Sequence, residues 1–381
     1  MKKVAVFTGK RGGFGAMFGI MDLINSDPEM ELQIIVSDMH LSEKFGSTIS
    51  EVEGRYEVSA YVDLGEYGDN LIDRTKALGK CIYELSNALE KLKPDLLLLL
   101  GDRGETLAAA FCAVEMGIIV GHIQAGDISG GVDDIHRHAI TKLSHLHFSQ
   151  NESQKQRVIN LGEIPEHVWN TGAPYIDNVI NAQLKPTLEV LNKYDIPFNS
   201  EGFYIVLHHS DTYNLKESSK QVNSILKVLS TVSKSKVVIY PCSDPGHIGI
   251  IREINKYKNT NDFYMFKSIE ALDFLSLLKG AKALIGNSSG GIIEAPYFNL
   301  PFVLVGGRQD GRQYGNNVIK VESDYENNII KALSTIDSDM FAKRMEGDVN
   351  LFGDGNASRK IYGAIKNTNL DDKLFRKRIV Y

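Results

Sequence analysis

Short apolar runs alternate with longer stretches of mixed polarity along most of this chain. Such an alternation predicts an α/β fold in which helices wrap a parallel sheet. The five consecutive leucines of Leu96–Leu100 are typical of a central strand that is buried on both faces. The strands expected in the first half are Val4–Thr8, Leu32–Ser37, Asp95–Leu100, Ile118–Gln124, Leu146–Ser149 and Val168–Thr171. The helices expected there are Ala16–Asn25, Leu71–Lys93, Thr106–Met116 and Asp134–Leu143.

The alternation stops near residue 172 and resumes in the second half of the chain. Gly172, Ala173 and Pro174 begin a polar segment that also contains Pro186 and Pro197. The strands expected beyond it are Phe203–Leu207, Val237–Tyr240, Phe263–Phe266, Ala283–Ile285 and Phe302–Val305. A chain of 381 residues usually exceeds one hydrophobic core. We therefore expect two Rossmann-like domains, residues 1–173 and 174–365, that face a central cleft, followed by a C-terminal tail at 366–381.

The composition argues against a nucleic-acid or membrane partner. Lys and Arg total 42 against 48 Asp and Glu, so the net charge is −6 and no bulk positive charge attracts nucleic acid. Three cysteines without metal or redox spacing fit a reducing compartment. The first predicted strand begins so close to Met1 that we expect no signal peptide, and no apolar run is long enough to span a membrane. We expect a cytoplasmic protein.

Asp102 is the first candidate functional residue, because an apolar strand leads directly to it through Gly101. It lies between that strand and the next predicted helix, at the edge of an open α/β sheet where ligands bind. A carboxylate near the positive end of a helix and beside Arg103 suits proton transfer or binding. In the alternative, Asp102 caps the helix and Arg103 neutralises it. This stretch by itself favours neither interpretation.

The loop from Gly9 to Gly15 occupies the usual position of a phosphate-binding loop, after a strand and before a helix. It contains Lys10 and Arg11 but matches neither the dinucleotide fingerprint nor the P-loop. It can be a tight glycine turn with two solvated cations. Its place at the edge of the sheet favours Arg11 as a contact for an anion or a sugar.

The segment from His122 to His138 is rich in titratable groups for a loop and the start of a helix. Asp133 or Asp134 can cap that helix. Carboxylates crowded near Asp102 would also raise one another's pKa values, which gives a sugar-active enzyme an acid and a base near neutral pH. The histidines at 136, 138, 145 and 147 do not have the spacing of a zinc motif, so we expect no metal.

A second turn of small residues, Gly286–Gly291, follows a predicted strand of the second half. Its hydroxyl and backbone N–H groups suit a pyrophosphate, and Glu294, one turn further on, can accept both hydroxyls of a ribose. A capping box would need a serine where the chain has Gly291. The guanidinium groups of Arg308 and Arg312 suit phosphate or base contacts. His209, after the strand Phe203–Leu207, is expected to face the same cleft.

Several motifs together resemble the hydrolysing UDP-N-acetylglucosamine 2-epimerases, and they occur in order along nearly the full chain. They are Gly101-Asp102-Arg103, Ser129-Gly130 with Asp133-Asp134, the segment from Arg137 to His145, Gly286-Asn287-Ser288-Ser289, Gly307-Arg308-Gln309 with Gly311-Arg312, and Gly353-Asp354-Gly355-Asn356-Ala357. The non-hydrolysing epimerases have Asp-Ser-Gly-Gly at the turn that begins here with Asn287, so the resemblance favours the hydrolysing branch. It implies the fold of the GT-B glycosyltransferases, with two Rossmann-like domains.

The resemblance also implies a reaction without a metal or other cofactor. The C2 proton is removed and UDP leaves to give a 2-acetamidoglucal, and water then adds to give the free 2-epimeric sugar. Asp102 is expected to be a catalytic acid or base, Asp133 a second catalytic carboxylate, and His209 the partner of the departing diphosphate. The expected contacts to the UDP-sugar are Arg11, Arg103, Arg137, His138, Asn287, Ser288, Ser289, Gly290, Glu294, Arg308 and Arg312.

The chain departs from the family pattern at Gln124, where an acidic residue is common, and in the first loop, which lacks a carboxylate. Because glutamine cannot transfer a proton at ordinary pH, either Asp127 takes over this step or the protein acts on a variant sugar. UDP-N-acetylglucosamine is the default substrate, and a diacetamido-trideoxyhexose nucleotide is the alternative. In relatives, both reactions lead to nonulosonic acids of the sialic or legionaminic type.

Two other classes of function stay open at this point. A GT-B glycosyltransferase would need an acceptor surface, and the sequence shows no basic or amphipathic stretch of that kind. A nucleotide-sugar-binding protein would have lost catalysis through Gln124. We further expect a homodimer or homotetramer.

Overall fold

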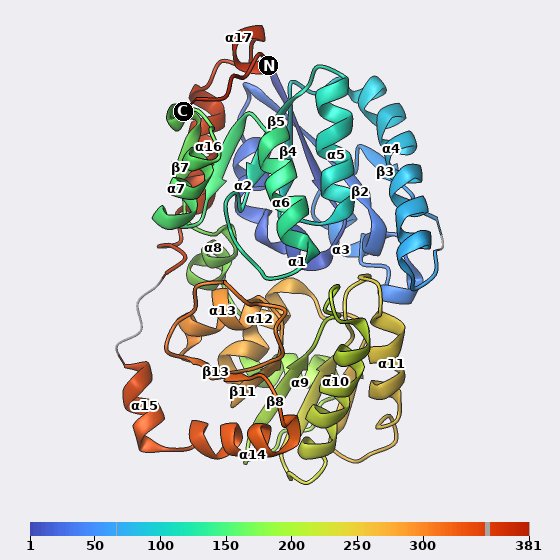
Figure 1. The fold of residues 1–381 in the computed structure, drawn as a ribbon, viewed down its shortest axis with the longest axis vertical. Helices are drawn as coiled ribbons and strands as arrows, with labels where there is room; N and C mark the ends of the chain where they lie inside the picture. The colour runs from blue at the N-terminus through green and yellow to red at the C-terminus, as the bar shows by residue number, and fades with distance from the viewer. Residues whose placement is uncertain (66, 347–350, 381) are drawn as a thin grey trace. The chain divides into compact units, whose positions relative to one another are not determined.

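The computed structural model describes residues 1–65, 67–346 and 351–380. It divides into two compact units, and Figure 1 shows that each is built from helices around a sheet. Unit 1 contains Met1–Ile128, Val132–Asn181 and the chain from Phe352 onward, and unit 2 contains Ser129–Gly131 and the chain from Ala182 to Leu351. Both sheets are parallel, with seven and six strands among the described residues. The predicted α/β class with two Rossmann-like sheets is confirmed.

The sheet of unit 1 has the strand order β3-β2-β1-β4-β5-β6-β7. The order changes direction between β1 and β4, which pair in parallel from Val4 opposite Leu96. Such a switch point is where open α/β sheets bind ligands, at the carboxyl ends of the strands. The strands are β1 Lys2–Thr8, β2 Met30–Ser37, β3 Ala60–Val62, β4 Leu96–Leu100, β5 Ile119–Ile123, β6 Leu146–Ser149 and β7 Val168–Asn170.

Helices cover both faces of this sheet, which explains why Leu96–Leu99 of β4 are completely buried. One face packs against α4 and α5, through residues such as Leu85 and Ala109. None of the helices in the described ranges is long and apolar enough to cross a membrane. The helices of unit 1 are α1 Arg11–Ala16, α2 Phe18–Asn25, α3 Ile49–Glu53, α4 Leu71–Leu92, α5 Gly104–Glu115, α6 Val132–Leu143, α7 Glu152–Asn160, α8 Pro174–Asn181, α16 Ala357–Asn367 and α17 Asp372–Phe375, with 3₁₀ turns η1 Asp38–His40, η2 Glu43–Phe45 and η3 Pro165–His167.

The sheet of unit 2 has the order β10-β9-β8-β11-β12-β13, with its switch point between β8 and β11. Its strands are β8 Phe203–Leu207, β9 Ser235–Ile239, β10 Phe263–Phe266, β11 Ala283–Gly286, β12 Phe302–Val305 and β13 Val318–Val321. Its helices are α9 Thr187–Lys193, α10 Leu215–Leu229, α11 His247–Asn255, α12 Ala271–Gly280, α13 Gly290–Ile293, α14 Tyr325–Ile336 and α15 Asp339–Met345, with the 3₁₀ turn η4 Ala295–Phe298.

Strands β3 and β13 and helix α1 are among the elements that the sequence pattern did not predict. Strands β3 and β13 each pair on one side only among the described strands, and their exposed residues, such as Tyr61, shorten the apolar pattern. Helix α1 contains three glycines, which disfavour a helix and predicted a loop. Burial of Phe14, whose ring packs 5.0 Å from that of Phe18, offsets this weak local preference.

The C-terminal segment returns to unit 1, and so does α8, whereas the sequence pattern grouped residues 174–365 in one domain. Asp177 of α8 accepts hydrogen bonds from Ala357 N at 2.9 Å and Ser358 N at 2.6 Å at the start of α16. At its other end, Lys2 Nζ donates to Thr368 O at 2.8 Å. These contacts join residues far apart in the sequence, so the local apolar pattern does not reveal them.

Candidate active site

Asp102 lies just beyond the carboxyl end of β4, and its carboxylate accepts a hydrogen bond from Arg137 of α6. The backbone turns before it at Gly101, whose φ of 89° suits glycine. Arg137 Nη1 also donates to Asp134 Oδ1 at 2.7 Å. The Arg137 side chain is fully buried, whereas those of Asp102 and Asp134 are 13% and 21% exposed. Solvent therefore reaches both carboxylates but not the cation that joins them.

Arg137 is a permanent countercharge at this site. Burial by itself lowers the pKa of its guanidinium, but Coulombic attraction, led by Asp102 and followed by Asp127, outweighs that effect and raises the pKa. A buried cation needs such partners, because an unpaired one would be very costly. The sequence suggested Arg137 as a substrate contact, and in the structure its guanidinium binds carboxylates of the protein itself.

Arg103, not Asp102, occupies the N-cap position of α5, and the Arg103 side chain makes no cap hydrogen bond. The buried Arg103 guanidinium pairs with Glu105 at 2.5 Å and with Asp38 at 3.2 Å. Arg74 of α4 pairs with the same two carboxylates. Asp102 is therefore not the N-cap residue of α5, which the capping alternative had assumed. Arg103, expected as a substrate contact, belongs to this buried ion network.

Gln124 and Asp127 lie together at the carboxyl end of β5. The strand ends at Ile123, one residue earlier than predicted, and Gln124 adopts a φ of 74°. Gln124 Nε2 donates to Asp127 Oδ2 at 3.2 Å, and Gln154 Nε2 donates to Oδ1 at 2.9 Å. Asp127 is only 2% exposed, so these amide donors partly replace the water that its carboxylate loses. Gln124 thus orients Asp127, which is one of the two explanations considered for the missing acidic residue at position 124.

The first turns of α6 carry further candidates. Asp133 and Asp134 lie in its first turn, where the positive end of the helix favours negative charge. His138 is partly buried, its pKa is lowered chiefly by burial, and its Nδ1 has no hydrogen-bond partner among the described residues. Arg11 begins α1 directly after the loop that follows β1. Because β1 and β4 are neighbours, Arg11 lies at the same edge of the sheet as Asp102.

In unit 2, Asn287 joins the carboxyl ends of β8 and β11. Its Oδ1 accepts a hydrogen bond from His209 N at 2.7 Å, and its Nδ2 donates to His209 O at 2.9 Å. Gln309, which follows β12, donates to Asn287 O at 2.8 Å. Asn287 was expected to contact the substrate, and its side chain holds the loops of this edge together.

The turn after β11 leaves one carboxylate available. Glu294 has no side-chain hydrogen bond or ion pair among the described residues, and burial raises its pKa to about 7. Gly290 makes room for it, because a Cβ there would lie 2.7 Å from Glu294 Oε2. Ser288 Oγ accepts a hydrogen bond from Gly290 N at 3.3 Å, and Ser289 is the N-cap residue of α13 without a side-chain cap bond.

His209 has a defined tautomer when neutral. Its Nδ1 accepts a hydrogen bond from Cys242 N at 3.1 Å, so the ring proton is on Nε2. Arg308, which follows β12, pairs with Asp244 at 3.5 Å, and Arg312 is a buried residue of the same loop. An Nε2–H donor and two guanidinium groups on the loops of one unit suit an anionic ligand such as a diphosphate.

The sequence profile of the UDP-N-acetylglucosamine 2-epimerases matches residues 22–366 of this chain. The chain belongs to this epimerase family. A relative in Legionella pneumophila, named UDP-N,N'-diacetylbacillosamine 2-epimerase (hydrolyzing), is 31% identical over 382 residues that cover 100% of both chains. The UDP-N-acetylglucosamine 2-epimerase of Neisseria meningitidis serogroup B is 34% identical over 334 residues, 87% of each chain. The family resemblance found in the sequence motifs is confirmed.

A solved structure of a family member has the same fold. The crystal structure of UDP-GlcNAc 2-epimerase from Neisseria meningitidis bound to UDP-GlcNAc superposes with a TM-score of 0.79, covering 97% of this chain and 100% of that chain. The sequence identity in this alignment is 22%, so the comparison concerns the fold. It agrees with the GT-B-like architecture that the resemblance implied.

His122 begins the segment that is rich in titratable groups, but it was not assigned a role. It lies within β5, and its Nε2 is 2.7 Å from Gly101 O while its Nδ1 is 3.1 Å from Thr141 Oγ1. Burial lowers its pKa to about 3, so the ring is neutral. A neutral ring can donate only from Nε2 here, because Gly101 O is an acceptor. The signal in the sequence was a histidine inside an apolar, doubly buried strand.

Two other histidines of this region, His145 and His147, have structural partners. His145 Nδ1 accepts a hydrogen bond from Val120 N at 3.1 Å, and His147 Nε2 is 3.1 Å from Glu163. Within residues 1–65, 67–346 and 351–380, no three His, Cys, Asp or Glu side chains are grouped to hold a metal ion.

His136, beside Asp102, was also not assigned a role. Its pKa is lowered chiefly by burial, although the Asp102 carboxylate raises it, and its Nδ1 has no hydrogen-bond partner among the described residues.

Proposed function

We propose that this protein is a hydrolysing UDP-sugar 2-epimerase that converts UDP-N-acetylglucosamine and water to UDP and the free 2-epimeric sugar. A diacetamido-trideoxyhexose nucleotide is the second candidate substrate. The observation that carries the proposal is the full-length similarity to relatives named as 2-epimerases, two of them hydrolysing. The free sugar would be a precursor for a nonulosonic acid of the sialic or legionaminic type.

The proposed reaction has two stages, with atoms balanced over both. A base removes the C2 proton as the bond from C1 to the diphosphate oxygen breaks, which releases UDP and leaves a 2-acetamidoglucal. Water then adds its hydroxyl to C1, and a proton is returned to C2 on the opposite face. The sum is one UDP-sugar and one water converted to UDP and the epimeric free sugar.

We assign nucleotide binding to unit 2. The unpartnered carboxylate of Glu294 can accept both ribose hydroxyls, while Ser288, Ser289, Arg308 and Arg312 are candidates for the diphosphate. His209 can donate from Nε2 to the departing diphosphate, because Cys242 N occupies its other ring nitrogen. Each of these groups carries the charge or donor that its assigned contact needs.

We assign proton transfer to unit 1. Asp102 is partly exposed to solvent and held by the buried Arg137, so it is the candidate base at C2. Asp133 is the candidate for the second proton step, and Asp127 the alternative. Gln124 orients Asp127 through a hydrogen bond and transfers no proton. The catalytic roles of these residues stay predictions.

Incubation with UDP-N-acetylglucosamine alone tests the proposal. We expect release of UDP and N-acetylmannosamine without any acceptor, and in D₂O the sugar should carry deuterium at C2. A glycosyltransferase would need a second substrate, and a binding protein would show only a thermal shift. A parallel assay with the diacetamido-trideoxyhexose nucleotide decides between the two substrates. No UDP release from either compound would contradict the proposal.

A further inference from the structure

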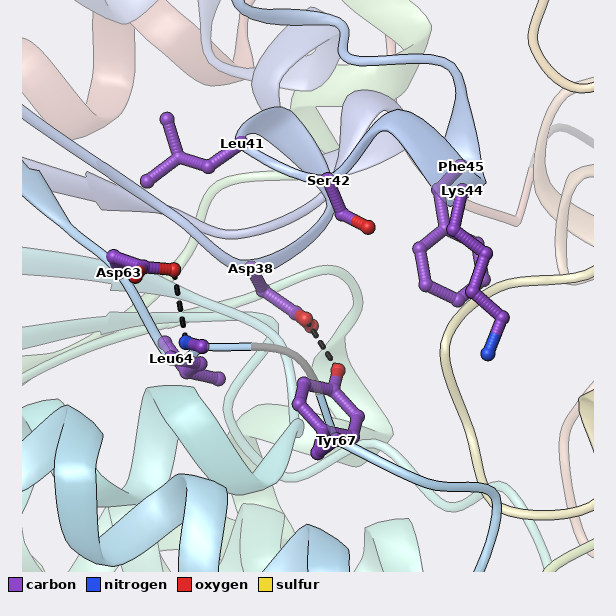
Figure 2. Close-up of a pocket in the computed structure, with 9 residues that line it drawn as sticks. Asp38, Leu41, Ser42, Lys44, Phe45, Asp63, Leu64 and Tyr67 are labelled. Atoms are coloured by element: carbon purple, nitrogen blue, oxygen red, sulfur yellow. Dashed lines mark hydrogen bonds between the residues drawn. The ribbon is translucent and has the colours of Figure 1, made fainter.

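A pocket in unit 1 lies apart from the residues assigned to the reaction. It has a volume of about 150 Å³ and is built from the chain segments that follow β2 and β3 (Figure 2). None of the described residues that line it belongs to the predicted site. Carboxyl ends of parallel strands are where this fold binds ligands, and the pocket lies at this edge of the sheet.

The carboxylates in the wall of the pocket are neutralised by neighbouring cations. Asp38 pairs with Arg103 at 3.2 Å and Arg74 at 3.5 Å. Asp63 pairs with Lys80 at 3.0 Å. A cationic ligand therefore finds no uncompensated carboxylate, and an anionic ligand would meet both carboxylates as well as the single cation of the described wall, Lys44. This balance of charge favours an uncharged ligand.

The polar groups of the wall include both donors and acceptors. Ser42 Oγ has no hydrogen bond to a described residue, and Lys44 Nζ has no carboxylate partner there but lies 5.7 Å from the centroid of the Phe45 ring. The carboxylate oxygens of Asp38 and Asp63 can accept further hydrogen bonds. A ligand with several hydroxyl groups can use donors and acceptors of this kind together.

Apolar groups complete the wall and limit the size of the ligand. They are the side chains of Leu41, Leu64 and Phe45 and the ring of Tyr67. Figure 2 shows the Tyr67 hydroxyl directed at Asp38, to which it donates at 2.5 Å, so the tyrosine ring and not its hydroxyl is left for a ligand. A cavity of about 150 Å³ admits one six-membered ring, whereas pockets for larger ligands are roughly 300–1,000 Å³.

We propose that this pocket binds one uncharged pyranose sugar. The ring size, the compensated charges and the mixture of apolar, donor and acceptor groups all fit that chemical class. The choice of sugar rests on the proposed function, since the reaction would release an uncharged 2-acetamido pyranose. Asp38 also links the pocket to the catalytic edge, because its partner Arg103 follows Asp102 directly in the chain.

A titration with N-acetyl-D-mannosamine, followed by ligand-observed NMR without nucleotide, tests this proposal. We expect a Kd on the order of 1 mM for a ligand of this size. Ser42→Trp places an indole in the pocket and should raise the Kd by about tenfold or more. Ser50→Trp, at an exposed position of α3 outside the pocket, is the matched control and should leave the Kd unchanged.

A second variant keeps the test independent of whether Ser42→Trp folds. Lys44→Ala removes one donor from a partly exposed position and should raise the Kd by about threefold. The proposal is wrong if the wild-type protein binds no pyranose, if inorganic phosphate binds in preference, or if Asp102→Asn abolishes sugar binding while Ser42→Trp retains it. Because no turnover is needed, a protein without epimerase activity could still bind the sugar, so the two proposals fail independently.

Discussion

The guanidinium of Arg137 is completely buried, while the side chain of Asp102 that it binds is 13% exposed. The pair therefore has one fixed member and one accessible member. The buried cation orients the carboxylate and offsets its charge, and a substrate can approach Asp102 from its solvent-exposed side. This relationship underlies the assignment of Asp102 as the proton-transfer group.

Replacing Asp102 with Asn should lower turnover by roughly a hundredfold or more, because a positioned acid or base is lost. UDP release measures the effect, and circular dichroism checks that the variant is folded. Asn caps a helix about as well as Asp, so a capping role would leave turnover nearly unchanged. A folded variant with wild-type turnover would remove Asp102 from the mechanism.

Replacing His122 with Phe should reduce kcat and leave UDP affinity unchanged. The change removes the hydrogen bond to Gly101 O next to Asp102, and a buried carbonyl without a partner costs about 1–3 kcal/mol of folding stability. His145→Phe is the control, since His145 also binds a backbone group but away from Asp102. Equal kinetic losses in the two variants would show that His122 has only a structural role.

Replacing Glu294 with Ala should weaken UDP binding by about 1.5–3 kcal/mol, or roughly 10- to 150-fold, because the ribose hydrogen bonds exist before the reaction begins. Calorimetry with UDP measures this directly. Glu326→Ala, at a surface ion pair of the same unit, serves as the control. Unchanged UDP affinity in Glu294→Ala would leave Glu294 a structural residue.

The raised pKa of Glu294 adds a pH dependence to the same binding step. Below about pH 7 the free carboxyl group is protonated, and the ionised form accepts hydroxyl donors better. UDP affinity should therefore fall as the pH drops through about 7, and Glu294→Gln should reduce that dependence. If the UDP affinity of Glu294→Gln depended on pH as strongly as that of the wild type, Glu294 would not be the group that titrates in this binding step.

We expect Asp133→Asn to lower turnover more than Gln124→Ala does, because only the carboxylates can transfer protons. Gln124→Glu should lower both turnover and stability, since it sets a second carboxylate against the buried Asp127. Initial rates of UDP release and urea denaturation measure the two effects. If Gln124→Ala abolished turnover while Asp127→Asn and Asp133→Asn retained it, the two-carboxylate mechanism would be wrong.

Glu163 should make stability depend on acidic pH. Burial by itself raises its pKa, but hydrogen bonds from His147, Lys142 and Lys377 outweigh this and lower the pKa to about 2, from an ordinary value of 4.5. The ionised form therefore stabilises the fold fully above about pH 4.5, and this contribution is lost as the pH falls toward 2. Glu163→Gln should be less stable than wild type at pH 7, with the difference shrinking across that window. Urea denaturation at several pH values measures it, and a constant difference would contradict the prediction.

The sequence by itself determined the α/β class, most strands of both sheets and the family. These features depend on local patterns, such as the apolar run that ends at Gly101 and the small-residue turn that begins at Asn287. It also placed Asp102 at a strand end, because a strand buried on both faces has a recognisable composition.

Only the tertiary structure decided which side chains meet. Arg137 reaches Asp102 across 35 positions of sequence, Arg103 joins Asp38 and Glu105, and Asp177 binds the start of α16 across 180 positions. The glycine-rich helix α1 and the short edge strands β3 and β13 likewise form because of packing and pairing that local propensity does not encode. The physical reason is the same in each case, since the stabilising partner lies far away in the sequence and becomes a neighbour only when the chain is folded.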